Sequence, residues 1–198
     1  MRRCLFVSTI LFLAPFFSAC QQETKVSQAK AEPAAETAKT QKILVAVYSW
    51  SGNTRHAAEI IAKTARAELF EIVPKEAYPE DYKECINKAK EDIANGVKPE
   101  LTSLPENIAS YDIIFVGTPN WWSTIAPPVK TFLDCLKDYK GLVVPFVTHG
   151  SGGLANCEKD IRNAVPNVKV STAGSWPGRS IDKADDAIAE WTKSVIGK

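Results

Sequence analysis

A cluster of hydroxyl, amide and glycine residues at positions 49–54 has the chemistry to bind a phosphate group. Ser49, Ser51 and Thr54 supply hydroxyl donors, Gly52 allows close backbone approach, and Asn53 opens a segment with helical spacing. Free N–H groups at a helix start, with the positive end of the helix dipole, bind phosphate without a basic side chain. A helix cap alone would need only one such residue, and the Gly-Lys-Ser/Thr ending of a nucleotide-hydrolysing loop is absent, so the cluster favours simple phosphate binding.

Two adjacent tryptophans, Trp121 and Trp122, stand in the polar segment 117–124 directly after an apolar run. Neighbouring side chains in an extended segment point in different directions, so both indoles cannot pack into one core. We expect one of them to pack against the domain and the other to stack on a planar ligand.

A glycine-rich segment, residues 148–153, follows a later apolar run. Its three glycines permit close approach of the backbone to the edge of a flat ring, whose carbonyls could accept from backbone N–H groups. A nucleophile elbow around Ser151 is the rival interpretation, but His149 occupies the first glycine position of the Gly-x-Ser-x-Gly pattern. The other histidine, His56, falls inside a helical segment, so a serine hydrolase is disfavoured.

Two hydrophobic patterns alternate from residue 42 onward. Buried-type apolar runs predict five strands, at 43–48, 67–73, 112–117, 142–148 and 168–172, of which the fourth is weakened by Pro145. Helical spacing predicts five helices, at 53–66, 81–94, 127–136, 154–164 and 182–196, with Asp182 as the cap of the last. This alternation predicts an α/β fold with a parallel sheet and helices on both faces. Ligands of such sheets bind at the carboxyl ends of the strands, where the three segments above would meet.

Taken together, the three segments resemble the FMN-binding loops of the flavodoxin-like family. Residues 49–54 resemble the phosphate loop; 117–121 resemble the first flavin loop, with Trp121 in the place of the stacking aromatic; and 148–153 resemble the second flavin loop. The resemblance covers residues 42–198 and implies a doubly wound five-stranded parallel sheet in the order 2-1-3-4-5. It also implies a set of cofactor-contacting residues: Ser49, Trp50, Ser51, Gly52, Asn53, Thr54, Thr118, Pro119, Asn120, Trp121, Trp122, Thr148, His149, Gly150, Ser151, Gly152 and Gly153.

The sequence departs from carrier flavodoxins in two ways. Carriers are strongly acidic, whereas residues 42–198 hold 19 of the 24 Lys and Arg residues and 20 of the 23 Asp and Glu residues. Trp122 stands where carriers often hold a small residue, and an indole should resist the positive φ that a peptide turned toward a half-reduced flavin needs. Both departures favour a two-electron FMN oxidoreductase, such as an NAD(P)H-dependent quinone or nitro-compound reductase. A one-electron flavodoxin and a non-catalytic FMN-binding module are the alternatives, and the pattern names no catalytic residue, electron donor or acceptor.

Charge and cysteine usage exclude other classes of protein. A nearly neutral domain has no basic excess with which to neutralise phosphates, so nucleic acid is disfavoured as a partner. Cys85, Cys135 and Cys157 lack the spacing of a metal site, so we expect no metal there and place all three in or beside the core as small apolar residues.

The first 41 residues predict export rather than fold. Arg2 and Arg3 precede an apolar run at 5–17 that is short for a membrane span, as in a signal peptide over residues 1–19. Cys20 follows, and the stretch resembles a bacterial lipobox, which implies a lipid on Cys20 and a location in the cell envelope, anchored through that lipid. The paired arginines also loosely fit a twin-arginine signal. Residues 20–41 lack apolar periodicity and predict a disordered tether.

Overall fold

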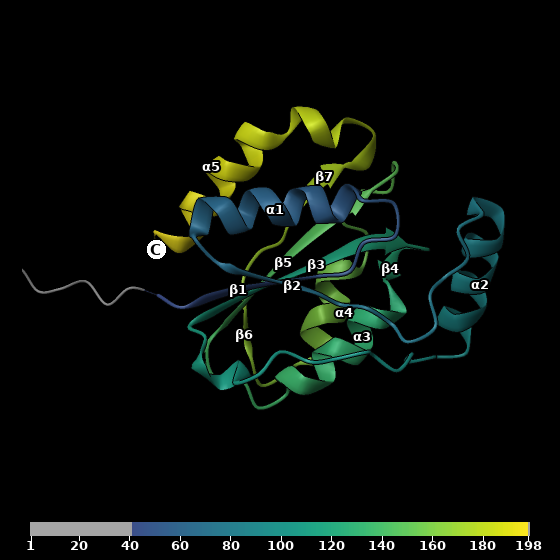
Figure 1. Cartoon of the computed structure of the whole chain (residues 1–198), viewed down its shortest axis with the longest axis horizontal. Coiled ribbons are helices and arrows are strands. Elements are labelled where there is room, and N and C mark those ends of the chain that lie inside the picture. The colour runs from purple at the N-terminus through teal and green to yellow at the C-terminus, as the bar shows by residue number, and fades with distance from the viewer. Residues whose placement is uncertain (1–40, 198) are drawn as a thin grey trace, which may run out of the picture. The chain divides into compact units, whose positions relative to one another are not determined.

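Strands and helices alternate along residues 41–197, the part of the chain that the computed structural model describes (Figure 1). The predicted signal peptide, Cys20 and all of the tether except Gln41 lie outside the described residues. The strands are β1 (Ile43–Val47), β2 (Glu68–Glu71), β3 (Ile113–Trp121), β4 (Thr124–Ile125), β5 (Leu142–His149), β6 (Lys169–Val170) and β7 (Gly174–Pro177). The α-helices are α1 (Asn53–Ala65), α2 (Tyr82–Ala94), α3 (Pro127–Leu133), α4 (Cys157–Ala164) and α5 (Asp185–Ile196). Short 3₁₀ turns are η1 (Ile108–Ser110), η2 (Asp134–Leu136) and η3 (Gly178–Lys183).

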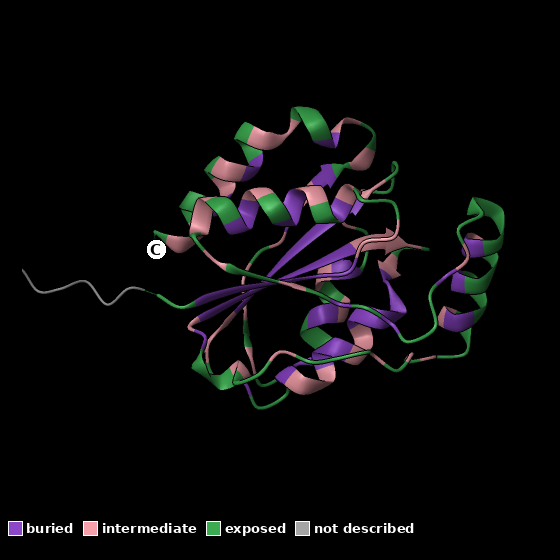
Figure 2. Ribbon diagram, in the orientation of Figure 1, coloured by how far each residue is buried: buried purple, intermediate pink, exposed green. Residues whose placement is uncertain are grey.

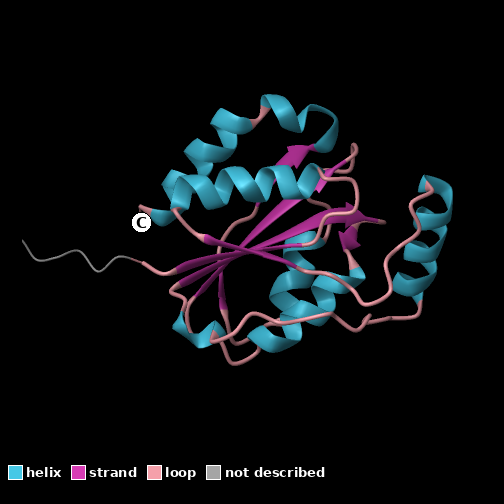
Figure 3. Cartoon of the chain, in the orientation of Figure 1, coloured by secondary structure: helices cyan, strands magenta, loops and turns pink. Residues whose placement is uncertain are grey.

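The sheet is parallel and has the predicted order. Its strands run β2-β1-β3-β5, and β5 pairs in parallel with both β6 and β7, which together form the fifth strand (Figure 3). The sequence did not predict β4, which turns back from the end of β3 and pairs with it antiparallel. The fold is therefore flavodoxin-like α/β, as expected.

The fifth strand is interrupted opposite Pro145. β6 ends where Val170 pairs with Val143, and β7 starts where Gly174 pairs with Phe146, so the three residues 171–173 face the two residues 144 and 145. The carbonyl of Val143 accepts from Ser171 in the fifth strand, and backbone groups alternate sides along a strand, so position 145 faces the same neighbour. Proline has no N–H to offer there, which is why the pairing breaks at this residue.

Helices cover both faces of the sheet. α1 and α5 lie on one face, and α3 and α4 on the other (Figure 1). The central strands are buried on both sides, as Figure 2 shows: residues 43–47 of β1 and 143–148 of β5 are buried throughout. This burial explains the continuous apolar runs, because a strand covered on both faces needs apolar side chains at every position.

Helix α2 differs from the other four. It stands beyond the carboxyl ends of the strands, apart from the two covering layers (Figure 1), and its buried side faces inward (Figure 2). Asp81 caps it by accepting from the backbone N–H of Glu84 at 2.9 Å. The buried residues of α2 are Cys85, Ala89 and Asp92, which share one helical face.

Two predicted helix starts and one predicted strand were wrong in detail. The last helix begins at Asp185, and Asp182 lies in η3 instead of capping it. The fourth helix begins at Cys157, because residues 150–156 form the loop beside the site. The fifth strand was placed at 168–172, ahead of its main segment β7.

The three cysteines lie in or beside the core, as predicted. Cys85 and Cys157 are buried, Cys135 is half-buried, and all three are free thiols. Burial raises the pKa of Cys135 to about 11 and that of Cys157 to about 12, so both stay protonated at neutral pH. Among the described helices, none is long and apolar enough to cross a membrane.

Candidate functional site

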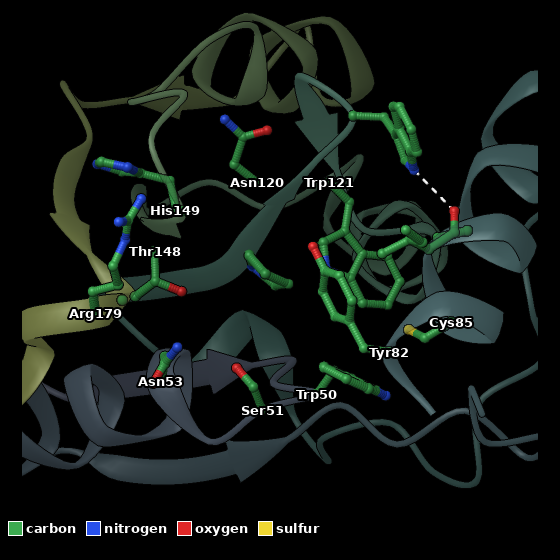
Figure 4. Close-up of a pocket in the computed structure, with 16 residues that line it drawn as sticks. Trp50, Ser51, Asn53, Tyr82, Cys85, Asn120, Trp121, Thr148, His149 and Arg179 are labelled. Carbon is green, nitrogen blue, oxygen red and sulfur yellow. Dashed lines mark hydrogen bonds between the residues drawn. The ribbon is translucent and has the colours of Figure 1, made fainter. Parts of the chain in front are cut away.

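A cavity of about 620 Å³ opens at the carboxyl ends of β3 and β5, beside the start of α1. The residues lining it are Trp50, Ser51, Asn53, Tyr82, Cys85, Ile86, Ala89, Pro119, Asn120, Trp121, Trp122, Thr148, His149, Gly150, Gly178 and Arg179. Figure 4 shows Asn53, Thr148, His149 and Arg179 on one side and Trp50, Tyr82 and Cys85 on the other. We call these two sides the polar end and the aromatic end. The volume lies within the usual range of small-molecule sites.

The start of α1 forms the floor of the polar end. Gly52 takes the N-cap position in the left-handed region, with φ of 87°, and among the described residues no side chain caps this helix. The first N–H groups of α1 therefore remain available to a ligand, and the helix dipole favours an anion there. The Oγ atom of Ser49 is buried and, within residues 41–197, has no hydrogen-bond partner. A phosphate group matches the uncapped helix start, whereas Ser49 itself does not line the cavity.

Thr54 connects the two sequence segments that meet at this end. Its side chain is buried, and its Oγ1 lies 2.7 Å from Oγ1 of Thr148 at the end of β5. Thr148 lines the cavity, whereas Thr54 lies behind it. A hydroxyl both donates and accepts, so Thr148 can accept from Thr54 and still donate a hydrogen bond to a ligand.

Arg179 supplies the only ionised side chain among the sixteen lining residues, and no carboxylate lines the cavity. Gly178 lets this segment approach α1 closely, because a Cβ at that position would stand 2.6 Å from Nδ2 of Asn53. A cationic guanidinium beside an uncapped helix start makes the polar end suited to an anion.

A tight hairpin places the two adjacent tryptophans. Trp122 and Ser123 join β3 to β4 and have φ of 50° and 66°, so two non-glycine residues in succession adopt the left-handed conformation that a two-residue hairpin turn requires. Such residues cost about 1 kcal/mol each. Trp122 Nε1 donates to the Ile86 carbonyl at 3.0 Å, and the Asn156 N–H donates to the Ser123 carbonyl at 3.0 Å, which helps to hold the turn. The expectation that Trp122 would resist positive φ was wrong.

The indole of Trp121 packs against two tyrosine rings. Its centroid lies 5.5 Å from that of Tyr48 and 4.9 Å from that of Tyr78, both edge to face. The ring is half-buried and also lines the cavity, whereas Trp122 is 51% exposed. One indole thus packs on the domain and the other is more open, and both line the cavity; that one of them stacks on a planar ligand stays a prediction.

Asn120 connects the end of β3 to the glycine-rich segment that follows β5. Its Nδ2 donates to the Gly153 carbonyl at 2.8 Å, and a Cβ at Gly152 would stand 3.2 Å from the same nitrogen. Gly152 and Gly153 therefore support Asn120 instead of lining the cavity. Thr118 has a similar supporting role, since its buried Oγ1 accepts from the Ala126 N–H at the start of α3.

Ten of the seventeen residues proposed from sequence line the cavity. They include His149, whose Nδ1 is buried and has no partner within the described residues, so it can bond a ligand. Seven do not line it: Ser49, Gly52, Thr54, Thr118, Ser151, Gly152 and Gly153. Ser151 is exposed. No three His, Cys, Asp or Glu side chains within residues 41–197 stand close enough to hold a metal ion.

Sequence reasoning missed six lining residues. Four belong to α2 (Tyr82, Cys85, Ile86 and Ala89) and two to η3 (Gly178 and Arg179). A signal existed for the η3 pair, because Gly178 and Arg179 directly follow the last strand, at the edge where ligands bind. Placing that strand at 168–172 hid it. Nothing local marked the α2 residues.

Residues 42–195 match the sequence model of the flavodoxin family. Two flavoprotein structures with similar folds come from Bacteroides uniformis (26% identity, TM-score 0.67, 77% of this chain and 98% of that one) and Lactobacillus acidophilus (28% identity, TM-score 0.61, 72% and 97%). The second is a complex with FMN. An NAD(P)H dehydrogenase (quinone) of Cupriavidus metallidurans is 33% identical over 93 residues, which are 47% of this chain and 45% of that protein. The chain thus matches less than half the length of that curated relative.

Proposed function

This chain belongs to the flavodoxin family, and we propose that it binds FMN in the cavity at the carboxyl ends of its strands and uses it as a two-electron oxidoreductase. The observation that carries the proposal is the polar end. An uncapped helix start, the Ser51 hydroxyl and the Arg179 side chain meet the needs of a phosphate. The FMN complex of the similar Lactobacillus acidophilus flavoprotein supports the assignment.

Different residues around the cavity would bind different parts of FMN. The N–H groups of the first turn of α1 and the Ser51 hydroxyl would bind the phosphate, and His149 would meet a polar edge of the ring. Trp50, Trp121 and Trp122 would border the flat ring and keep water from it. Bound FMN would supply the electron chemistry by accepting two electrons from a donor and passing them to an acceptor.

Flavin selectivity tests the phosphate assignment. The apoprotein should bind FMN, bind riboflavin much more weakly and exclude FAD, because one phosphate loop is present and no second nucleotide motif accompanies it. Quenching of flavin fluorescence measures all three affinities. Equal affinity for riboflavin and FMN would show that the polar end does not bind the phosphate.

Two observations support two-electron chemistry with a quinone-like or other small acceptor. The domain lacks the acidic excess by which carriers find their partners, and a stretch of 93 residues is 33% identical to an NAD(P)H dehydrogenase (quinone). The apolar aromatic end suits a flat, uncharged acceptor. The steric argument from Trp122 no longer contributes, since that residue already has positive φ.

A one-electron flavodoxin is the second candidate, favoured by the family match itself. Potentiometric titration of the FMN-loaded protein separates the two candidates. A two-electron enzyme should show little one-electron-reduced flavin at the midpoint and should turn over NAD(P)H with a quinone or nitro compound. A large one-electron population without turnover would establish the carrier, and tight FMN binding with neither behaviour would indicate a binding module.

We also propose that a lipid on Cys20 anchors the protein to a bacterial membrane on the exported side, with residues 21–41 as the tether. Cys20→Ser should release the protein or stall its processing, since one cysteine carries the anchor. Mass spectrometry of the native N-terminus measures this directly. A mature N-terminus beyond residue 20 without a lipid would disprove it, and export without the twin-arginine machinery would exclude that route.

A further inference from the structure

Helix α2 carries a buried carboxylate that does not line the cavity. Asp92 is 6% exposed, in the last turn of the helix. Its two oxygens accept three hydrogen bonds: Oδ2 from the Tyr78 hydroxyl at 2.8 Å, and Oδ1 and Oδ2 from Lys88 Nζ at 2.9 and 3.0 Å. A buried carboxylate is unfavourable unless it is paired, and here both oxygens are satisfied.

Tyr78 links Asp92 to the wall of the cavity. It lies in the segment between β2 and α2, is 7% exposed, and does not line the cavity that Trp121 lines. Burial and the hydrogen bond to Asp92 raise the pKa of the phenol, so it remains a donor. Its ring meets the Trp121 indole edge to face at 4.9 Å with an interplanar angle of 73°. Two successive contacts therefore join Asp92 to a ring of the site.

Apolar packing alone would not fix these rings. An edge-to-face pair tolerates rotation of either partner, whereas a hydrogen bond to a carboxylate is directional and charge-assisted. The hydroxyl of Tyr78 is held at one point on α2, so the direction in which its ring axis points toward Trp121 is defined. Lys88 adds a second restraint, with Nζ 5.9 Å from the centroid of the same ring.

We propose that Asp92 is a positioning residue of the flavin site, acting through the Tyr78 hydroxyl to hold the Trp121 indole at the cavity wall. This inference rests on the proposed binding of FMN. It assigns a functional role to a side chain that touches neither the cavity nor the flavin, and it explains why α2 uses one of its three buried positions for a charge.

The test compares two tyrosines that each lose one buried hydroxyl. Tyr78→Phe keeps the ring against Trp121 and removes the bond to Asp92. Tyr139→Phe is the matched control: Tyr139 is 4% exposed, and its hydroxyl donates to the Tyr111 carbonyl at 3.0 Å, before the amino ends of β5 and β3. Both variants should lose stability toward urea, and Tyr78→Phe should lose somewhat more, since each loses one buried hydrogen bond and that of Tyr78 is charge-assisted. Only Tyr78→Phe should weaken FMN binding, by about three- to tenfold, and alter the visible circular dichroism of bound FMN.

Asp92→Asn should change FMN binding in the same direction as Tyr78→Phe but by less, because the amide oxygen can still accept from the Tyr78 hydroxyl without the charge. If that variant does not fold, Tyr78→Phe decides alone. The indole N–H resonance of Trp121 in the apoprotein, assigned by its absence in Trp121→Phe, gives a readout that needs no flavin. It should move in Tyr78→Phe and stay in place in Tyr139→Phe.

The outcomes separate this inference from the proposed function. If the wild type binds no FMN, the proposed function fails, and the indole resonance still tests the positioning. If Tyr78→Phe and Tyr139→Phe give the same FMN affinity, visible spectrum and Trp121 resonance as the wild type, Asp92 is a structural residue only and the inference is rejected.

Discussion

The two ends of the cavity are built by different means. At the polar end, backbone N–H groups and short side chains come from the start of α1, which packs on the sheet, and from the end of β5, and η3 adds Arg179. At the aromatic end, long side chains come from α2 and from a hairpin turn, both beyond the strand ends. The first is held by the core of the domain. The second is held by the buried face of α2, whose Cys85 and Ala89 reach the core, and by bonds such as that from Trp122 Nε1 to the Ile86 carbonyl.

This difference predicts a division of roles. Groups fixed by the core cannot move without unfolding part of the sheet, so the polar end should determine whether the cofactor binds. The aromatic end can shift without loss of the fold, so it should determine how the ring is oriented and what reaches it.

Removing the hydroxyl donors of the polar end should have the largest effect. Ser51→Ala combined with Thr54→Ala should weaken FMN binding by about 3 kcal/mol, more than a hundredfold in Kd, because it removes the Ser51 donor and the hydroxyl that orients Thr148 toward the ligand. Fluorescence titration with FMN measures it. Thr54→Ser keeps the hydroxyl beside Thr148 and is the control. If the double variant binds FMN as the wild type does, the phosphate does not bind at the polar end.

Removing one hydrogen bond at the aromatic end should have a smaller effect, and that effect should be confined to α2. Trp122→Phe removes the bond to the Ile86 carbonyl and should lower stability by about 1 kcal/mol. Hydrogen exchange should become faster in α2 and remain unchanged in α1. Equal acceleration in both helices would mean that the two ends are not independent.

Relieving the backbone strain in the β3–β4 turn should stabilise the aromatic end slightly. Ser123 has φ of 66°, where glycine carries no Cβ penalty, so Ser123→Gly should raise the free energy of unfolding by about 0.5–1 kcal/mol. The control is Ser103→Gly, an exposed serine without positive φ. Urea denaturation compares the two. Stabilisation of both variants, or of neither, would contradict the strain at the turn.

The smallest effect should come from an ion pair on the segment that returns from α2. Lys98 contacts Asp134 at 2.7 Å, and hydrogen bonds from Lys137 and Lys98 hold the pKa of Asp134 below its usual value. A lowered folded pKa gives stability that is present at neutral pH and is lost as pH falls below about 4. Both partners are partly exposed, so the contribution is about 0.5 kcal/mol. The difference in urea midpoint between wild type and Asp134→Asn should therefore shrink between pH 6 and pH 3; a constant difference would contradict it.

The sequence predicted the sheet and the polar end because both depend on local patterns. The apolar runs at 43–48 and 142–148 match strands buried on both faces, and the hydroxyl cluster before α1 is contiguous. The role of Cys85, Ile86 and Ala89 could not be predicted in this way, because helical spacing shows that a face is buried but not what it faces. Trp122 was misjudged since intrinsic preference disfavours positive φ, and the geometry of the β3–β4 turn overrode it.

The interrupted fifth strand has a consequence for association between molecules. A sheet edge with a long regular row of free N–H and C=O groups is a template for pairing with another chain. Here β6 has two residues and β7 has four, and the irregular segment opposite Pro145 separates them, so no long row exists on that side. At the other edge, β2 has four residues and carries a glutamate at each end, Glu68 and Glu71. Both edges therefore oppose edge-to-edge aggregation, and the folded domain should stay dispersed at high local concentration.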